Sequence, residues 1–132
     1  MAALLAAPLV MAQTSVPKVR ATIPFAFTAG GKTIPAGECT FSHLYGTGAG
    51  SPLWMVEDQE GRGQSFFITQ AAYKQPNTRP SVVFNCYGSR CFLSSIWSSG
   101  EFGVYIPPTK AERNLMVAGV KPEQTVLFAQ LR

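Results

Sequence analysis

The sequence predicts a mainly β protein, a small antiparallel β-barrel of about eight strands with one short helix before the last strand. A length of 132 residues allows one domain with a single core. The nine Phe, four Tyr and two Trp favour strands. Ten Pro and twelve Gly, scattered along the chain, divide it into short elements. A β-sandwich is the alternative, because the spacing of strands and turns is the same in both architectures.

Residues 1–12, MAALLAAPLVMA, predict a signal peptide, and residues 13–132 then form the single mature domain. The segment is uncharged and ends in the small residue Ala12, as a signal-peptidase site requires. It lacks the usual positively charged start, which suggests a truncated signal. A buried N-terminal helix is the alternative. A membrane span is not expected, because the stretch is shorter than the ~20 residues that cross a bilayer. Export predicts a secreted or periplasmic protein, in which cysteines can pair.

The charge pattern argues against a nucleic-acid partner. The net charge is +4, with 11 Lys and Arg residues against seven Asp and Glu residues, and the basic residues are spread along the chain. A nucleic-acid-binding protein would instead show a basic stripe with aromatic residues in register. We therefore expect no nucleic-acid partner. We also expect no membrane span in the mature chain, because no segment there comes close to the ~20 apolar residues that a bilayer requires.

Alternation of apolar and polar residues predicts the strands. It is clearest from Val19 to Thr28, where Pro24 would mark an edge strand or a bulge because proline donates no ladder hydrogen bond. Turns rich in Gly and Pro separate the further strands. These are expected at residues 38–43, 53–57, 64–73, 81–87, 90–97, 102–106 and 125–131.

A capping box predicts the helix. Thr109 and Glu112 have the spacing at which the hydroxyl and the carboxylate each accept a hydrogen bond from a free amide at the helix start. Gly119 is a plausible C-terminal stop. The apolar face of this helix would hold Ala111, Leu115 and Ala118.

Three segments resemble a set of small exported bacterial proteins that have no established activity. They are IPFAFTAGGKTIPAGECTF (23–41), VVFNCYGSRCFLSSIW (82–97) and PPTKAERNLM (107–116). The shared pattern is close to I-P-F-x-F-x-x-G-x-K-x-[LI]-P-A-G-E, followed by an aromatic hairpin and K-A-E-R. This chain departs from it at Cys39 and Cys91, where the pattern has Tyr. The resemblance implies export and a β fold, and it implies no activity.

The hairpin around Gly88 and Ser89 predicts a disulfide. With these two residues at the turn, Cys86 faces Cys91 in a non-hydrogen-bonded pair with Cα atoms ~4.5 Å apart. A redox motif would have two intervening residues at a helix start, and a zinc ribbon would need a second cysteine pair. We therefore predict a structural bond between these cysteines, with Cys39 free and buried. Two reduced cysteines are the alternative.

Catalytic and metal-binding patterns are scarce. His43 shares a strand face with Cys39, but side chains four residues apart on a strand are ~13 Å apart, too far to bind one metal. His43 could meet Cys86 or Cys91 across the fold, which is the one route to a thiolate nucleophile or a three-ligand zinc site. No metal or cofactor is predicted.

Two loops have sequences that resemble ion-binding sites. The acidic residues Glu57, Asp58 and Glu60 could bind Ca²⁺, although their spacing does not match an EF-hand and a solvated turn explains them better. The glycine-rich loop 46–50 leads into a strand instead of a helix N-terminus, so it is not expected to bind phosphate.

Three functions follow from these observations. The first is an exported non-catalytic β-barrel that binds a small apolar ligand or a partner surface, with Trp54 and Trp97 as candidate lining residues. The second is a structural or interaction module of the cell envelope or extracellular matrix. The minor alternative is an enzyme that uses His43 with a cysteine or an acidic residue. A cavity lined by Phe and Trp would favour the first, and a filled interior with an apolar patch outside would favour the second.

Overall fold

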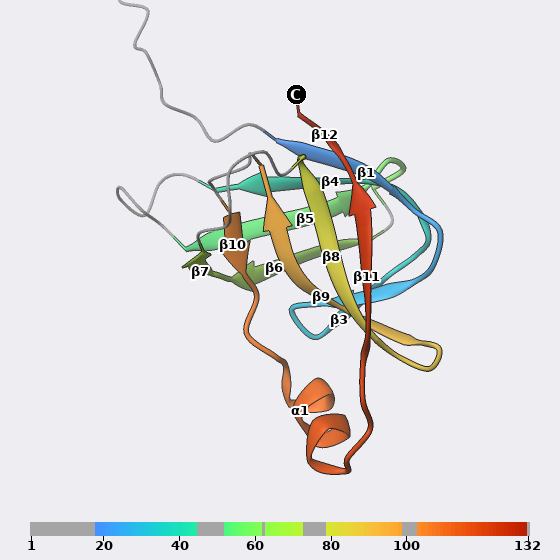
Figure 1. Ribbon diagram of the computed structural model, residues 1–132. Coiled ribbons are helices and arrows are strands. Elements are labelled where there is room, and N and C mark those ends of the chain that lie inside the picture. Colours follow the sequence, from blue (N-terminus) through green and yellow to red (C-terminus); the bar gives the residue numbers. More distant parts are fainter. Residues whose placement is uncertain (1–17, 45–51, 62, 73–78, 99–102, 132) are drawn as a thin grey trace, which may run out of the picture.

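The computed structural model describes residues 18–44, 52–61, 63–72, 79–98 and 103–131 (Figure 1). The predicted signal peptide, the glycine-rich loop 46–50 and Phe102 lie outside these ranges.

The predicted mainly β fold with one short helix is confirmed over the described residues. The helix α1 spans Lys110–Val117. It is too short and too polar to cross a membrane. The strands are β1 Val19–Ile23, β2 Phe27–Ala29, β3 Lys32–Ile34, β4 Gly37–His43, β5 Leu53–Asp58, β6 Gln64–Ile68, β7 Gln70–Ala72, β8 Ser81–Tyr87, β9 Arg90–Trp97, β10 Gly103–Tyr105, β11 Glu123–Phe128 and β12 Gln130–Leu131.

These strands form two sheets. The first has the order β12-β1-β4-β5-β6, and the second has the order β11-β8-β9-β10-β7, with β2 joined to β9 and β3 joined to β2. The described pairs are antiparallel except β2 with β9, which is parallel. The sequence predicted antiparallel pairing throughout. The exception arises because the chain leaves β1 and crosses to the other sheet without reversing direction.

Three of the predicted strands are broken where the chain passes from one sheet to the other. The breaks lie at Pro24–Ala26 between β1 and β2, at Thr69 between β6 and β7, and at Ala129 between β11 and β12. Proline has no N–H to continue a ladder, so a corner is a natural place for it. Pro24 therefore ends β1, which lies between β12 and β4, and it does not mark an edge strand. Sheets joined by strands that change sheet make the corners of a flattened barrel.

The ring of strands closes on both sides. On one side β11 continues into β12, which pairs with β1. On the other side the hairpin β2–β3 lies between β9 and β6, and the hydroxyl of Ser65 on β6 donates to the carbonyl of Ala29 at 2.5 Å. The architecture is thus closer to the predicted barrel than to an open sandwich.

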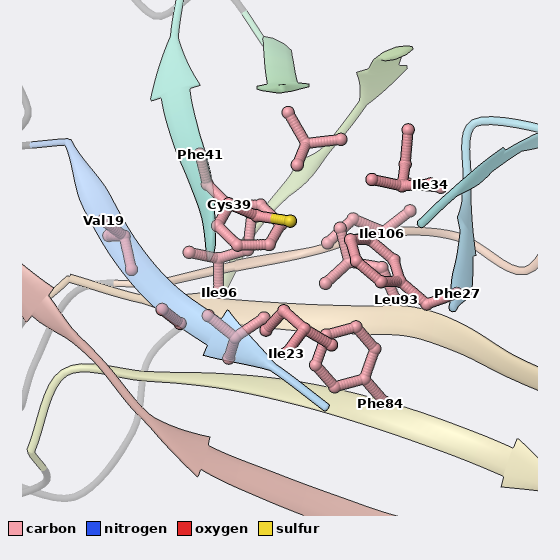
Figure 2. Packing of buried hydrophobic residues seen from close by; sticks show 14 of the residues in the cluster. Val19, Ile23, Phe27, Ile34, Cys39, Phe41, Phe84, Leu93, Ile96 and Ile106 are labelled. Atoms are coloured by element: carbon pink, nitrogen blue, oxygen red, sulfur yellow. The ribbon is translucent and has the colours of Figure 1, made fainter. Parts of the chain in front are cut away.

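The interior of the barrel is filled by side chains from both sheets (Figure 2). Phe27, Phe41 and Phe84 are each at most 1% exposed, and the rings of Phe27 and Phe84 meet edge to face with centroids 5.0 Å apart. The remaining core comes from the inward positions of the alternating strands, including Val19, Ile23, Ile34, Cys39, Leu93, Ile96 and Ile106.

Candidate functional site

The hairpin of β8 and β9 has the predicted register and the predicted disulfide. Cys86 pairs with Cys91 across the strands, their sulfur atoms are bonded, and their Cα atoms are 4.0 Å apart. Gly88 in the turn has a φ of 65°, a conformation that glycine adopts without steric cost. Closing this small ring constrains the unfolded chain and stabilises the fold by about 2 kcal/mol.

Cys39 is free and buried, as predicted. Burial, and to a smaller extent the charges of Asp58 and Glu38, raise the pKa of its thiol to about 11. A nucleophilic cysteine needs a lowered pKa, because the thiolate is the reactive form. The environment of Cys39 therefore favours a packing role in the core.

His43 lies at the end of β4, where it pairs with Trp54 on β5 and their rings meet edge to face at 5.7 Å. The thiols of Cys86 and Cys91 are joined to each other, so the predicted route from His43 to a thiolate or to a zinc site through them is closed. Over the described residues, no group of three His, Cys, Asp or Glu side chains is placed to bind a metal ion.

The two tryptophans are packed among other side chains. Trp54 is 4% exposed and belongs to the barrel core. Trp97 is 3% exposed and packs with Ala72 and Val83 on the second sheet. Its indole N–H donates to the hydroxyl of Ser95 at 3.0 Å. Gly103 on β10 makes this packing possible, because a Cβ atom at that position would collide with the Trp97 ring.

The acidic turn after β5 borders an open, polar hollow of about 470 Å³. The sequence predicted a solvated turn, but Asp58 is only 8% exposed, and its carboxylate accepts a hydrogen bond from the amide of Gly63 at 3.0 Å. Arg20 and Glu38 form an ion pair beside it, with Nε and Oε1 3.0 Å apart. The hydrogen bond between Gly63 and Asp58 fixes the turn internally. The hollow is lined by Arg20, Glu38, Thr40, Glu57, Asp58, Gln59, Glu60 and Gly61.

The helix is attached through a buried carboxylate that the sequence analysis assigned to a cap. The hydroxyl of Thr109 accepts a hydrogen bond from the amide of Glu112, which is the first half of the predicted capping box. The Glu112 carboxylate does not complete the box. It instead accepts from the hydroxyl of Tyr87 at 2.8 Å and from the side-chain amide of Asn85 at 3.3 Å. The sequence did not predict these hydrogen bonds, because the capping box also places a glutamate at this position.

A surface that the sequence analysis missed lies on β11. Leu127 and Ala129 pack against the barrel core, so the alternating side chains Val126 and Phe128 point outward, where they are 46% and 57% exposed. The guanidinium of Arg79 lies 4.0 Å from the centre of the Phe128 ring. We call Arg79, Val126 and Phe128 the β11 surface. The sequence shows the alternation in this segment. It does not show which of the two strand faces packs against the core.

Comparisons of the chain with protein-family models, with curated proteins and with solved structures find no match. The resemblance of the three segments to small exported bacterial proteins therefore remains a prediction.

Proposed function

We propose that the protein is an exported, non-catalytic binding module that recognises a protein partner through the β11 surface. The observation that carries this proposal is the contrast between the filled interior and the outward-facing Val126 and Phe128.

The interior supports a partner at the surface over a small ligand inside. The three phenylalanines at the centre of the barrel are at most 1% exposed, and Trp54 packs with them in the same core. A small-molecule site is usually a cavity of roughly 300 Å³ or more with apolar walls. The hollow of about 470 Å³ lies beside the acidic turn and is lined by charged and polar residues, so it does not have apolar walls.

The chemistry of the β11 surface supports a protein partner. Aromatic residues and arginine are enriched where proteins bind one another, and Phe128 with Arg79 over its ring combines the two.

Export is supported by three independent features. They are the uncharged leader at residues 1–12, the disulfide of the hairpin and the resemblance to exported bacterial proteins. Disulfides persist in oxidising compartments. The enzyme alternative has lost support, because two of its candidate thiols are bonded together and the thiol of Cys39 has a raised pKa.

Native mass spectrometry of the protein purified from its host tests the proposal. We expect a complex with a second protein, and we expect Phe128→Ser combined with Val126→Ser to abolish that complex. The matched control is Phe66→Ser on β6, which removes a side chain that is 52% exposed elsewhere on the barrel and should retain the partner. A small apolar molecule that remains bound to the purified chain would instead favour an internal ligand and contradict the proposal.

A further inference from the structure

The helix α1 stands away from the two sheets and projects beyond them (Figure 1). Its buried residue is Glu112, which faces the barrel through Tyr87 and Asn85. The opposite face of the helix must therefore point away from the barrel. Residues about 140–160° from Glu112 around the helix occupy that face, and they include Lys110 and Val117.

Apolar side chains gather at the free end of this projection. Val117 is 88% exposed, Met116 49% and Val120 41%. Val120 is held close to the helix, because its amide donates to the carbonyl of Leu115 and the amide of Gly119 donates to that of Met116. These two hydrogen bonds and the φ of 81° at Gly119 form a Schellman motif. The motif confirms the predicted stop at Gly119 and fixes the three exposed apolar side chains at one end.

The exposed charges of the same projection are mainly positive. Lys110 and Arg113 lie on the helix, and Lys121 follows it, all of them exposed. Of the two acidic residues nearby, Glu112 is turned toward the barrel and Glu123 begins β11. We call Lys110, Arg113, Met116, Val117, Val120 and Lys121 the α1 tip.

We propose that the α1 tip binds the surface of an anionic lipid bilayer. Exposed apolar side chains on a segment that also carries Lys and Arg are the chemistry of segments that lie in a lipid interface, where the apolar groups enter the acyl boundary and the cations meet the headgroups. A projecting helix end can reach a flat surface without interference from the barrel. This binding goes beyond the proposed protein partner, because it uses a different surface of the molecule.

Flotation of the full chain with lipid vesicles tests the proposal. We expect binding to vesicles of phosphatidylglycerol mixed with phosphatidylcholine, little binding to phosphatidylcholine alone, and weaker binding at higher salt. Lys121→Gln should weaken binding about fivefold, the value of one basic residue near such a surface. Val117→Asp should weaken it by roughly tenfold, since it places a charge where an apolar group enters the interface.

Two matched controls separate the tip from the rest of the molecule. Lys32→Gln removes an exposed charge from β3, and Ile68→Asp adds an acid at an exposed apolar position of β6. Both should bind like the unmodified chain, and circular dichroism should show all four variants folded.

Equal binding to both kinds of vesicle, unchanged binding by Val117→Asp, or no binding by the unmodified chain would overturn the proposal. Self-association in the ultracentrifuge that Val117→Asp abolishes would assign the tip to a second copy instead. None of these outcomes depends on the β11 surface.

Discussion

The three cysteines show how placement decides the chemistry of a side chain. Cys86 and Cys91 face each other across the hairpin and are bonded, whereas Cys39 points into the barrel core beside phenylalanines (Figure 2). The bonded pair could be predicted from the sequence, because a two-residue turn fixes which residues face each other. The raised pKa of Cys39 could not be predicted, since it depends mainly on burial within the assembled fold and, to a smaller extent, on Asp58, which faces Cys39 from β5.

Tyr87 gives a prediction about alkaline pH. Burial, followed by the hydrogen bond to Glu112, raises the pKa of its phenol to about 12. Between the ordinary pKa of about 10 and this value, the unfolded chain loses a proton that the folded chain keeps. The stabilisation is therefore complete below about pH 10 and is lost as the pH rises through about 12.

Urea unfolding at about pH 9 and about pH 11 should show this loss in the unmodified chain. Tyr87→Phe should be less stable at the lower pH, because it removes a hydrogen bond from the Glu112 carboxylate. It should also lose less stability between the two pH values. An equal loss in both proteins would mean that Tyr87 does not carry the effect.

At the scale of elements, two contacts of the helix can be ranked. Thr109→Ala removes the N-cap and should cost about 1 kcal/mol of unfolding free energy. Glu112→Ala should cost more, roughly 1–3 kcal/mol, because it leaves the buried hydroxyl of Tyr87 without its acceptor. Urea unfolding measures both, with Asn114→Ala, an exposed helix position, as the control. A larger cost for Thr109→Ala would show that the N-cap stabilises the helix more than the hydrogen bond between Glu112 and Tyr87 does.

The sequence predicted the existence of the strands and the helix better than it predicted the sheet and the pairing partner of each strand. Alternation and turn residues located the β8–β9 hairpin to the residue, and the capping pattern located the start of α1. The corners were not predicted, because alternation continues through Pro24 and Thr69 while the chain changes sheet. Nor was the parallel pair β2–β9, which depends on residues distant in sequence. The hydrogen bonds of Glu112 to Tyr87 and Asn85 were not predicted for the same reason, because they join residues distant in sequence.

At the scale of the whole molecule, the two sheets meet on one side where β6 continues through Thr69 into β7, which pairs with β10. The β2–β3 hairpin also lies against β6 on this side. The described link between the hairpin and β6 is the hydroxyl of Ser65 donating to the carbonyl of Ala29. The hairpin turn also approaches closely, because the space at Gly30 is bounded by the carbonyl oxygen of Phe66 and the hydroxyl of Ser65.

Two adjacent glycines allow this contact to be tested. Gly30 and Gly31 both have positive φ, at 60° and 80°, so alanine at either position costs about 1–2 kcal/mol in the backbone. A Cβ at Gly31 meets no atom within 4 Å, whereas one at Gly30 collides with β6. Gly30→Ala should therefore be less stable than Gly31→Ala by roughly 1–3 kcal/mol in urea unfolding, the usual cost of overpacking. Hydrogen exchange should show the extra loss concentrated in β6. Equal stabilities would mean that the hairpin does not close the barrel against β6.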